Sequence, residues 1–139
     1  MIGDSAAIHH VSLPVTDVER SRPFYRDVLG LEEIERPAFA FKGAWYRVGE
    51  NQQLHLIEGT HSTLRGEKGV DPRDIHFALR VPSFRDALEL LRSKGYRDDA
   101  AEDDPMAMKV SPHATAGFPQ IHLLDPDRNV IEINATELD

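Results

Sequence analysis

Two segments of this sequence share one pattern, a short alternating strand followed by a helix that ends at a glycine. Residues 8–15, IHHVSLPV, and residues 74–81, DIHFALRV, alternate between apolar and polar side chains, which predicts a strand in each place. A histidine in each strand precedes the glycine by nearly the same distance, 20 positions in the first copy and 19 in the second. These pairs are His10 with Gly30 and His76 with Gly95. A repeated strand–helix frame predicts a chain built from two similar halves.

Each half continues with further strand-like runs after its helix. Asp17 is a good N-cap for the first helix and Ser83 for the second, and Pro23 predicts an irregular first turn in the first helix. The remaining strands are expected at about 31–36, 39–48 and 53–58, and at 117–124 and 129–134, with polar stretches at 59–73 and near 97–116. We therefore predict an α+β fold of two β-α-β-β-β modules, module 1 at about 8–58 and module 2 at about 74–134, within a single domain, residues 1–139.

Period-two alternation then sorts the polar side chains of the strands by face. In the first strand Val11 and Leu13 share the apolar face, so His10 lies opposite them and His9 lies with them. In 74–81 the apolar face is expected to hold Ile75, Phe77, Leu79 and Val81. The same reasoning places four residues opposite the apolar face of their strands: His10, His55, His76 and Glu132. They occur in the first and last strand of each half, so symmetric pairing of the halves would bring all four together.

Three histidines and one carboxylate are a typical ligand set for a divalent metal. Imidazole and carboxylate groups bind Zn, Ni, Co, Fe and Mn. A single histidine on the outer face of a strand is usually a surface residue, whereas four such residues at equivalent positions of a repeat are hard to assign to chance. The spacing alone leaves the metal-site and surface interpretations about equally supported.

The composition argues against several classes of function. The formal net charge of −8 disfavours nonspecific nucleic-acid binding, which needs a basic surface. No apolar run approaches a membrane span, and the first residues, MIGDSAA, lack the basic start and apolar stretch of a signal peptide. The chain has no cysteine, and therefore no disulfide or thiolate chemistry. We expect a cytoplasmic protein that acts on a small molecule, without nucleic-acid or membrane partners.

Three segments of the chain resemble the vicinal oxygen chelate superfamily, which includes glyoxalase I, methylmalonyl-CoA epimerase, extradiol dioxygenases, fosfomycin-resistance proteins and bleomycin-binding proteins. They are HVSLPVTDVERSRPFYRDVLGLE, DIHFALRV and LLDPDRNVIEI, and the likeness covers about residues 8–134. The resemblance implies a single glyoxalase-like domain in which paired β-α-β-β-β modules form a curved sheet around a divalent metal, and it implies a homodimer. Carried over by position, its metal ligands are His10, His55, His76 and Glu132.

The resemblance implies a metal-dependent lyase or isomerase of the glyoxalase I type. Four protein ligands on a six-coordinate ion leave two positions for substrate oxygens, whose developing charge the metal stabilises. Glu132 is the expected base, and His122, which alternates onto the same face, is a candidate proton donor or shuttle. His55 departs from glyoxalase I, which generally has an acidic or amide residue there. The sequence leaves the metal open among Zn, Ni, Co, Fe and Mn.

Two alternatives remain open. The first is an extradiol-type dioxygenase using Fe(II), whose pattern His113, His122 and Glu132 resemble in spacing, with His122 standing where that pattern has tyrosine. His55 as a fourth ligand would fill a position that oxygen chemistry needs free. A binding protein that sequesters a drug or metabolite is disfavoured by the complete ligand set. It is also disfavoured because alternation divides the neighbouring aromatic residues between faces, so that no aromatic cluster is expected. These residues are Phe39, Phe41, Trp45 and Tyr46.

The substrate is not defined by the sequence. Leu13-Pro14-Val15 and Thr115-Ala116-Gly117 stand where the glyoxalase I pattern has basic residues, which counts against glutathione as cosubstrate. Three arginines are candidates for binding an acidic substrate, although such side chains are more often solvated: Arg22, Arg47 and Arg80.

Overall fold

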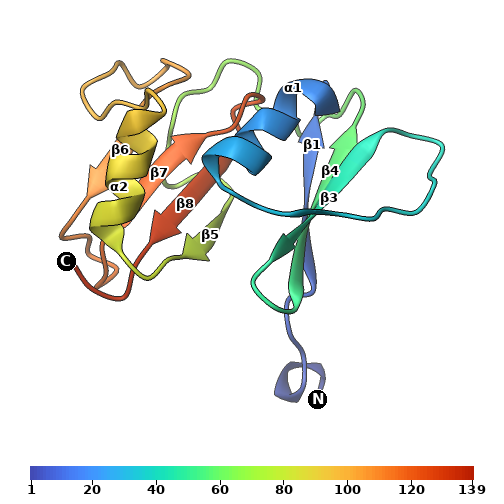
Figure 1. Ribbon diagram of the computed structural model, residues 1–139, viewed down its shortest axis with the longest axis horizontal. Helices are drawn as coiled ribbons and strands as arrows, with labels where there is room; N and C mark the ends of the chain where they lie inside the picture. The colour runs from blue at the N-terminus through green and yellow to red at the C-terminus, as the bar shows by residue number, and fades with distance from the viewer. The chain divides into compact units, whose positions relative to one another are not determined.

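Both predicted modules are present, each as a four-stranded mixed sheet with its helix (Figure 1). The computed structural model describes all residues from 1 to 139, which divide into two compact units, unit 1 (Met1–Leu64) and unit 2 (Arg65–Asp139). The strand–helix–strand–strand–strand order confirms the predicted fold class. That the two modules make up one domain stays a prediction.

Unit 1 has the strand order β1-β4-β3-β2. Its strands are β1 (His10–Val15), β2 (Glu33–Ile34), β3 (Gly43–Val48) and β4 (Gln52–Glu58). β1 runs parallel to β4, and β3 pairs antiparallel with both β4 and β2. Val15, Tyr46, Leu54 and Leu56 are fully or almost fully buried, as alternation predicts for one apolar face. The opposite face of the sheet is left to polar and aromatic side chains, among them the candidate ligands.

The helical segment of unit 1 has two parts. α1 (Val18–Pro23) begins where the Asp17 carboxylate accepts a hydrogen bond from the Glu19 backbone N–H, at 2.9 Å. After Pro23 the chain forms one π-helical turn, η2 (Phe24–Val28), in which the Leu29 N–H donates to the Phe24 carbonyl at 3.0 Å. The irregularity therefore follows Pro23 instead of occupying the first turn as predicted.

Unit 2 repeats the arrangement with the strand order β5-β8-β7-β6. Its strands are β5 (His76–Arg80), β6 (Met108–Ser111), β7 (Gln120–Leu124) and β8 (Val130–Asn134). The helix α2 (Phe84–Ser93) is capped by Ser83, whose hydroxyl accepts from the Asp86 N–H at 3.0 Å, and it appears in front of β6 and β7 in Figure 1. β5 runs parallel to β8, as β1 does to β4. None of the helices is long and apolar enough to cross a membrane.

Two details of unit 2 differ from the sequence predictions. β6 lies within the stretch 97–116, where no strand is predicted, because its four residues contain only one pair of alternating apolar side chains. Ile75 is expected on the apolar face but is 96% exposed, since β5 begins one residue later and Ile75 lies outside the pleat. In unit 1 the predicted strand at 31–36 shrinks to the two residues of β2, with Pro37 close behind.

Candidate metal centre

Three ligand-type side chains meet on one face of the unit 2 sheet. They come from three adjacent strands, and one ligand atom from each lies within 4.8 Å of the others. His76 Nε2 is 3.6 Å and His122 Nε2 is 3.0 Å from Glu132 Oε1. The strand register explains the meeting, because Glu132 on β8 lies between Ala78 on β5 and His122 on β7. We call His76, His122 and Glu132 the unit 2 cluster.

The cluster is buried on one side and accessible on the other. Glu132 and His122 are 5% and 2% exposed, whereas the His76 side chain is 26% exposed. Burial lowers the pKa of His122, although the neighbouring Glu132 carboxylate acts in the opposite direction. His76 is therefore the exposed member of the cluster, while the carboxylate and the second imidazole are shielded from bulk water.

The outer contacts of the cluster fit a divalent metal ion held by His76 and Glu132. His76 Nδ1–H donates to the Asp74 carbonyl at 2.7 Å, so the Nε2 lone pair faces the cluster, as in most metal-binding histidines. Glu132 Oε2 accepts from the Asn134 amide at 2.5 Å, which leaves Oε1 for the cluster. His122 Nδ1 is buried without a hydrogen-bond partner. Because no hydrogen bond to Nδ1 fixes the ring of His122, this residue is better suited to carry a proton at Nε2 than to bind the metal.

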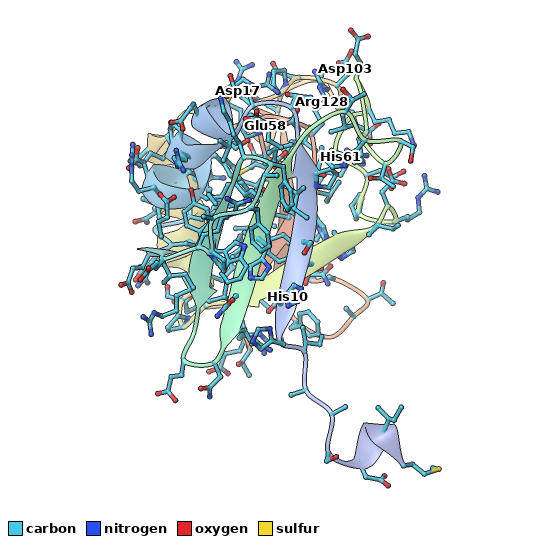
Figure 2. All side chains as sticks on the ribbon, turned by 90° about the vertical axis from the view of Figure 1, so that its right-hand side faces the viewer. His10, Asp17, Glu58, His61, Asp103 and Arg128 are labelled. Atoms are coloured by element: carbon cyan, nitrogen blue, oxygen red, sulfur yellow. The ribbon has the colours of Figure 1, made fainter.

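Unit 1 places two of the predicted ligands at equivalent positions. In β1 and β4, Ser12 pairs with His55 as Ala78 pairs with Glu132, so His10 and His55 correspond to His76 and Glu132. The His10 ring stacks on the His55 ring with centroids 4.3 Å apart. Figure 2 shows His10 at the start of β1, at the other end of the strand from Asp17 and Glu58.

His55 is held as a neutral imidazole. Trp45 stacks on the face of His55 that His10 leaves free, with centroids 4.0 Å apart. Burial lowers the pKa of His55 to about 4, helped by the charges of His10, His9 and Arg36. His55 Nε2–H donates to Gln53 Oε1 at 2.8 Å, which leaves Nδ1 as its available lone pair. A neutral imidazole with one free nitrogen is the form that binds metals.

The predicted site residues thus fall into two groups. His10 and His55 lie together in unit 1, and His76 and Glu132 lie together in unit 2, joined by His122. Convergence of the four predicted ligands on one ion stays a prediction. The sequence reasoning missed Asn134, the partner of Glu132, although it is the next residue on the same face of β8.

The prediction that unit 1 has no aromatic cluster was wrong. Phe39 stacks on Phe41 with centroids 5.0 Å apart and lies 6.1 Å from the Trp45 ring, while the Arg36 guanidinium lies over both phenylalanine rings. Phe39, Phe41 and Trp45 are separated by even numbers of residues, so alternation separates only Tyr46 from them, although Phe39 and Phe41 lie in the loop that precedes β3. Only Tyr46 is on the other side of the sheet, buried against Tyr25.

Comparisons with known proteins agree with this architecture. The profile of the family described as "Glyoxalase/Bleomycin resistance protein/Dioxygenase superfamily" matches residues 7–133. The chain is 28% identical over 129 residues to Glyoxylase I 4 of Arabidopsis thaliana, covering 91% of this chain and 69% of that protein. It is 31% identical over 94 residues to lactoylglutathione lyase of Salmonella typhimurium, covering 62% and 66%.

Solved structures show the same fold. A glyoxalase/dioxygenase from Nostoc punctiforme has a TM-score of 0.72 at 23% identity, with 96% of this chain and 92% of that chain covered. The fosfomycin resistance protein FosX from Listeria monocytogenes has a TM-score of 0.67 at 19% identity, with 94% and 93% covered. At these identities the structural likeness concerns the fold alone.

Proposed function

Because the chain belongs to the Glyoxalase/Bleomycin resistance protein/Dioxygenase superfamily, we propose that it is a metal-dependent lyase or isomerase that moves a proton on a small oxygenated metabolite. The observation that carries the proposal is the unit 2 cluster, in which a buried carboxylate lies between two imidazoles. The names of the relatives, Glyoxylase I 4 and lactoylglutathione lyase, support the same class of reaction. By the same resemblance we expect the protein to be a homodimer.

In the proposed mechanism, His76 and Glu132 would hold a divalent ion, and His10 and His55 would complete its ligand set. The ion would supply a Lewis acid that stabilises negative charge on two substrate oxygens. Glu132 takes the proton from the substrate carbon, since its burial excludes competing water. His122 Nε2, 3.0 Å from Glu132 Oε1, then carries the proton onward or returns it to the product.

Metal content tests the first half of the proposal. Protein purified without an affinity tag is analysed by mass spectrometry, with His55→Ala beside it. About one nickel, cobalt or zinc ion per site, reduced in the variant, is the expected result. Absence of metal from both proteins, even after metal is added back, would overturn the proposed function.

Proton exchange on a panel of candidate substrates tests the second half of the proposal. Small 2-hydroxy and 2-oxo compounds, together with the hemithioacetal of methylglyoxal and glutathione, are incubated with the metal-loaded protein in D2O. Loss of the carbon-bound proton is followed by NMR. Exchange on at least one compound, abolished in Glu132→Gln, is expected; equal exchange by wild type and variant would exclude Glu132 as the base.

A second candidate function is ring cleavage by an Fe(II) dioxygenase. It is favoured by the composition of the unit 2 cluster, because two histidines and one carboxylate are the ligand set of non-haem Fe(II) oxygenases. Iron retained at full occupancy in His55→Ala would support it over the lyase or isomerase. A third candidate, a non-catalytic drug-binding protein, gains support from the aromatic cluster of Phe39, Phe41 and Trp45 and would be the surviving proposal if no metal binds.

A further inference from the structure

The sheet face that carries the unit 2 cluster continues to a second pair of polar residues. Arg80 on β5 is paired with Asn134 on β8, two residues beyond the pair of Ala78 and Glu132. Side chains two residues apart on a strand point to the same face. Arg80 and Asn134 therefore share the face of the unit 2 cluster.

The guanidinium of Arg80 is held in place by three neutral groups. Its Nε donates to Asn134 Oδ1 at 2.5 Å, and its Nη1 donates to the Thr136 hydroxyl at 3.1 Å. Its Cζ lies 4.8 Å from the centre of the Phe118 ring, over one face. These contacts leave the Nη2 amine and one Nη1 N–H as a pair of parallel donors, which is the geometry that binds a carboxylate through two hydrogen bonds.

The charge of Arg80 is not neutralised by its contacts. The other two arginines considered for substrate binding do form ion pairs, Arg22 with Glu19 and Glu33, and Arg47 with Glu32. Arg80 is exposed and contacts only an amide, a hydroxyl and an aromatic ring, in a chain with a formal net charge of −8. A fixed, accessible guanidinium that no carboxylate contacts is suited to a ligand that supplies a negative charge.

Arg80 is also close to the cluster. The Asn134 amide that accepts from Arg80 donates to Glu132 Oε2 at 2.5 Å, so a single amide group separates the guanidinium from the carboxylate. The equivalent positions in unit 1 are Pro14 and Ile57, which have no side-chain hydrogen-bonding groups. The pair of Arg80 and Asn134 is therefore a feature of the second module alone.

We infer that Arg80 binds a carboxylate group of the substrate, so that the substrate class is a small hydroxy- or oxo-carboxylate whose oxygens reach the unit 2 cluster. This inference rests on the proposed function, because it assigns the second end of a substrate held at that cluster. The distance spanned is short, since only one amide lies between the two groups. A chain of two or three carbons joins a carboxylate to chelating oxygens over that length.

Two hydroxamates of equal size test the inference by binding, without a turnover assay. Succinate monohydroxamate carries a terminal carboxylate, and butyrohydroxamate replaces it with a methyl group. Each is titrated into the Co²⁺-loaded protein, and the visible absorption of the cobalt reports binding. Arg80→Met removes the charge and keeps an apolar side chain of similar length over Phe118, whereas Arg80→Lys keeps the charge. The matched control is Arg92→Met, because Arg92 is an arginine of α2 that pairs with Asp98.

We expect wild type and Arg92→Met to bind succinate monohydroxamate at least about tenfold more tightly than butyrohydroxamate, because the guanidinium offers the carboxylate two charge-assisted hydrogen bonds. Arg80→Met should lose this preference with its butyrohydroxamate affinity unchanged, and Arg80→Lys should keep part of it.

Cobalt binding without any carboxylate preference in wild type would overturn the inference and leave the proposed function standing. Equal weakening of both hydroxamates in Arg80→Met would also overturn it, and would make Arg80 a positioning residue that acts on Glu132 through Asn134. Failure of wild type to bind cobalt would overturn the proposed function and this inference together.

Discussion

Unit 1 and unit 2 use the same strand register to hold different chemistry. The positions of His76, His122 and Glu132 in unit 2 correspond to His10, Trp45 and His55 in unit 1. In unit 2 these residues are a carboxylate and two imidazoles, one within hydrogen-bonding reach of the carboxylate at 3.0 Å and the other at 3.6 Å. In unit 1 they are three stacked rings, with a neutral histidine between the other two. The repeat preserves where a side chain points, whereas the residue type decides whether that position carries charge.

The difference predicts that unit 2 carries out the proton transfer and that unit 1 contributes to metal binding. At the equivalent positions only unit 2 has a carboxylate to accept a proton with a buried imidazole beside it to carry the proton, and only unit 2 has the Arg80 and Asn134 pair. Unit 1 offers neutral nitrogen ligands and flat aromatic surface. If the comparison is right, substitutions in unit 2 reduce chemistry, while substitutions in unit 1 reduce metal affinity.

The largest effect is expected for Glu132→Gln. The variant keeps the shape of the side chain but cannot accept a proton, so the exchange rate should fall by about 10²–10⁴-fold, the usual contribution of a general base. Metal binding should weaken only in part, because His76 and the other ligands remain. The rate is measured by NMR in D2O and the metal affinity by titration. Glu89→Gln, an exposed position on α2, is the matched control and should leave both unchanged.

A smaller effect is expected for His55→Ala. The variant should raise the dissociation constant of Zn²⁺ by at least about 10- to 100-fold, the range found when a metal site loses only an outer partner of one of its ligands. Trp45 is the single tryptophan of the chain and stacks on His55, so its fluorescence should change when Zn²⁺ binds to the wild type. Unchanged fluorescence on saturation with Zn²⁺ would show that unit 1 does not bind the ion, and the comparison would then reduce to a three-residue site in unit 2.

The sequence predicted the frame of both units better than their contacts. Alternation is a local property, so the faces of His10, His55, His76 and Glu132 could be assigned from their neighbours in the strand. Contacts that depend on which strands pair could not be assigned, and the link from Arg80 through Asn134 to Glu132 is of this kind. The contacts of loop residues could not be predicted either, because alternation assigns a side chain to a face only within a strand.

The smallest effect concerns two buried tyrosines, one in each unit. The Tyr46 hydroxyl in unit 1 is buried without a hydrogen-bond partner. Tyr46→Phe should therefore leave the free energy of unfolding unchanged or raise it by up to about 1 kcal/mol, because the desolvated hydroxyl gains nothing in the folded state. Chemical denaturation at pH 7 measures this. A loss of more than about 1 kcal/mol would mean that the hydroxyl has a partner, and Tyr46 would then belong to a polar network like that of unit 2.

The same variant has a defined pH dependence. Burial raises the pKa of Tyr46 to about 12, and that of Tyr96 in unit 2 to about 12, where the charge of Asp125 adds to the effect. An unfolded tyrosine has a pKa of about 10, so between about pH 10 and 12 the folded state keeps protons that the unfolded state releases. Stability is therefore fully present below about pH 10 and falls as the pH rises towards 12. Tyr46→Phe and Tyr96→Phe should each make this fall shallower, by similar amounts, when denaturation is repeated from pH 8 to 11. A change confined to one of the two variants would show that only that unit sets alkaline stability, and that burial of this side chain differs between the two modules in solution.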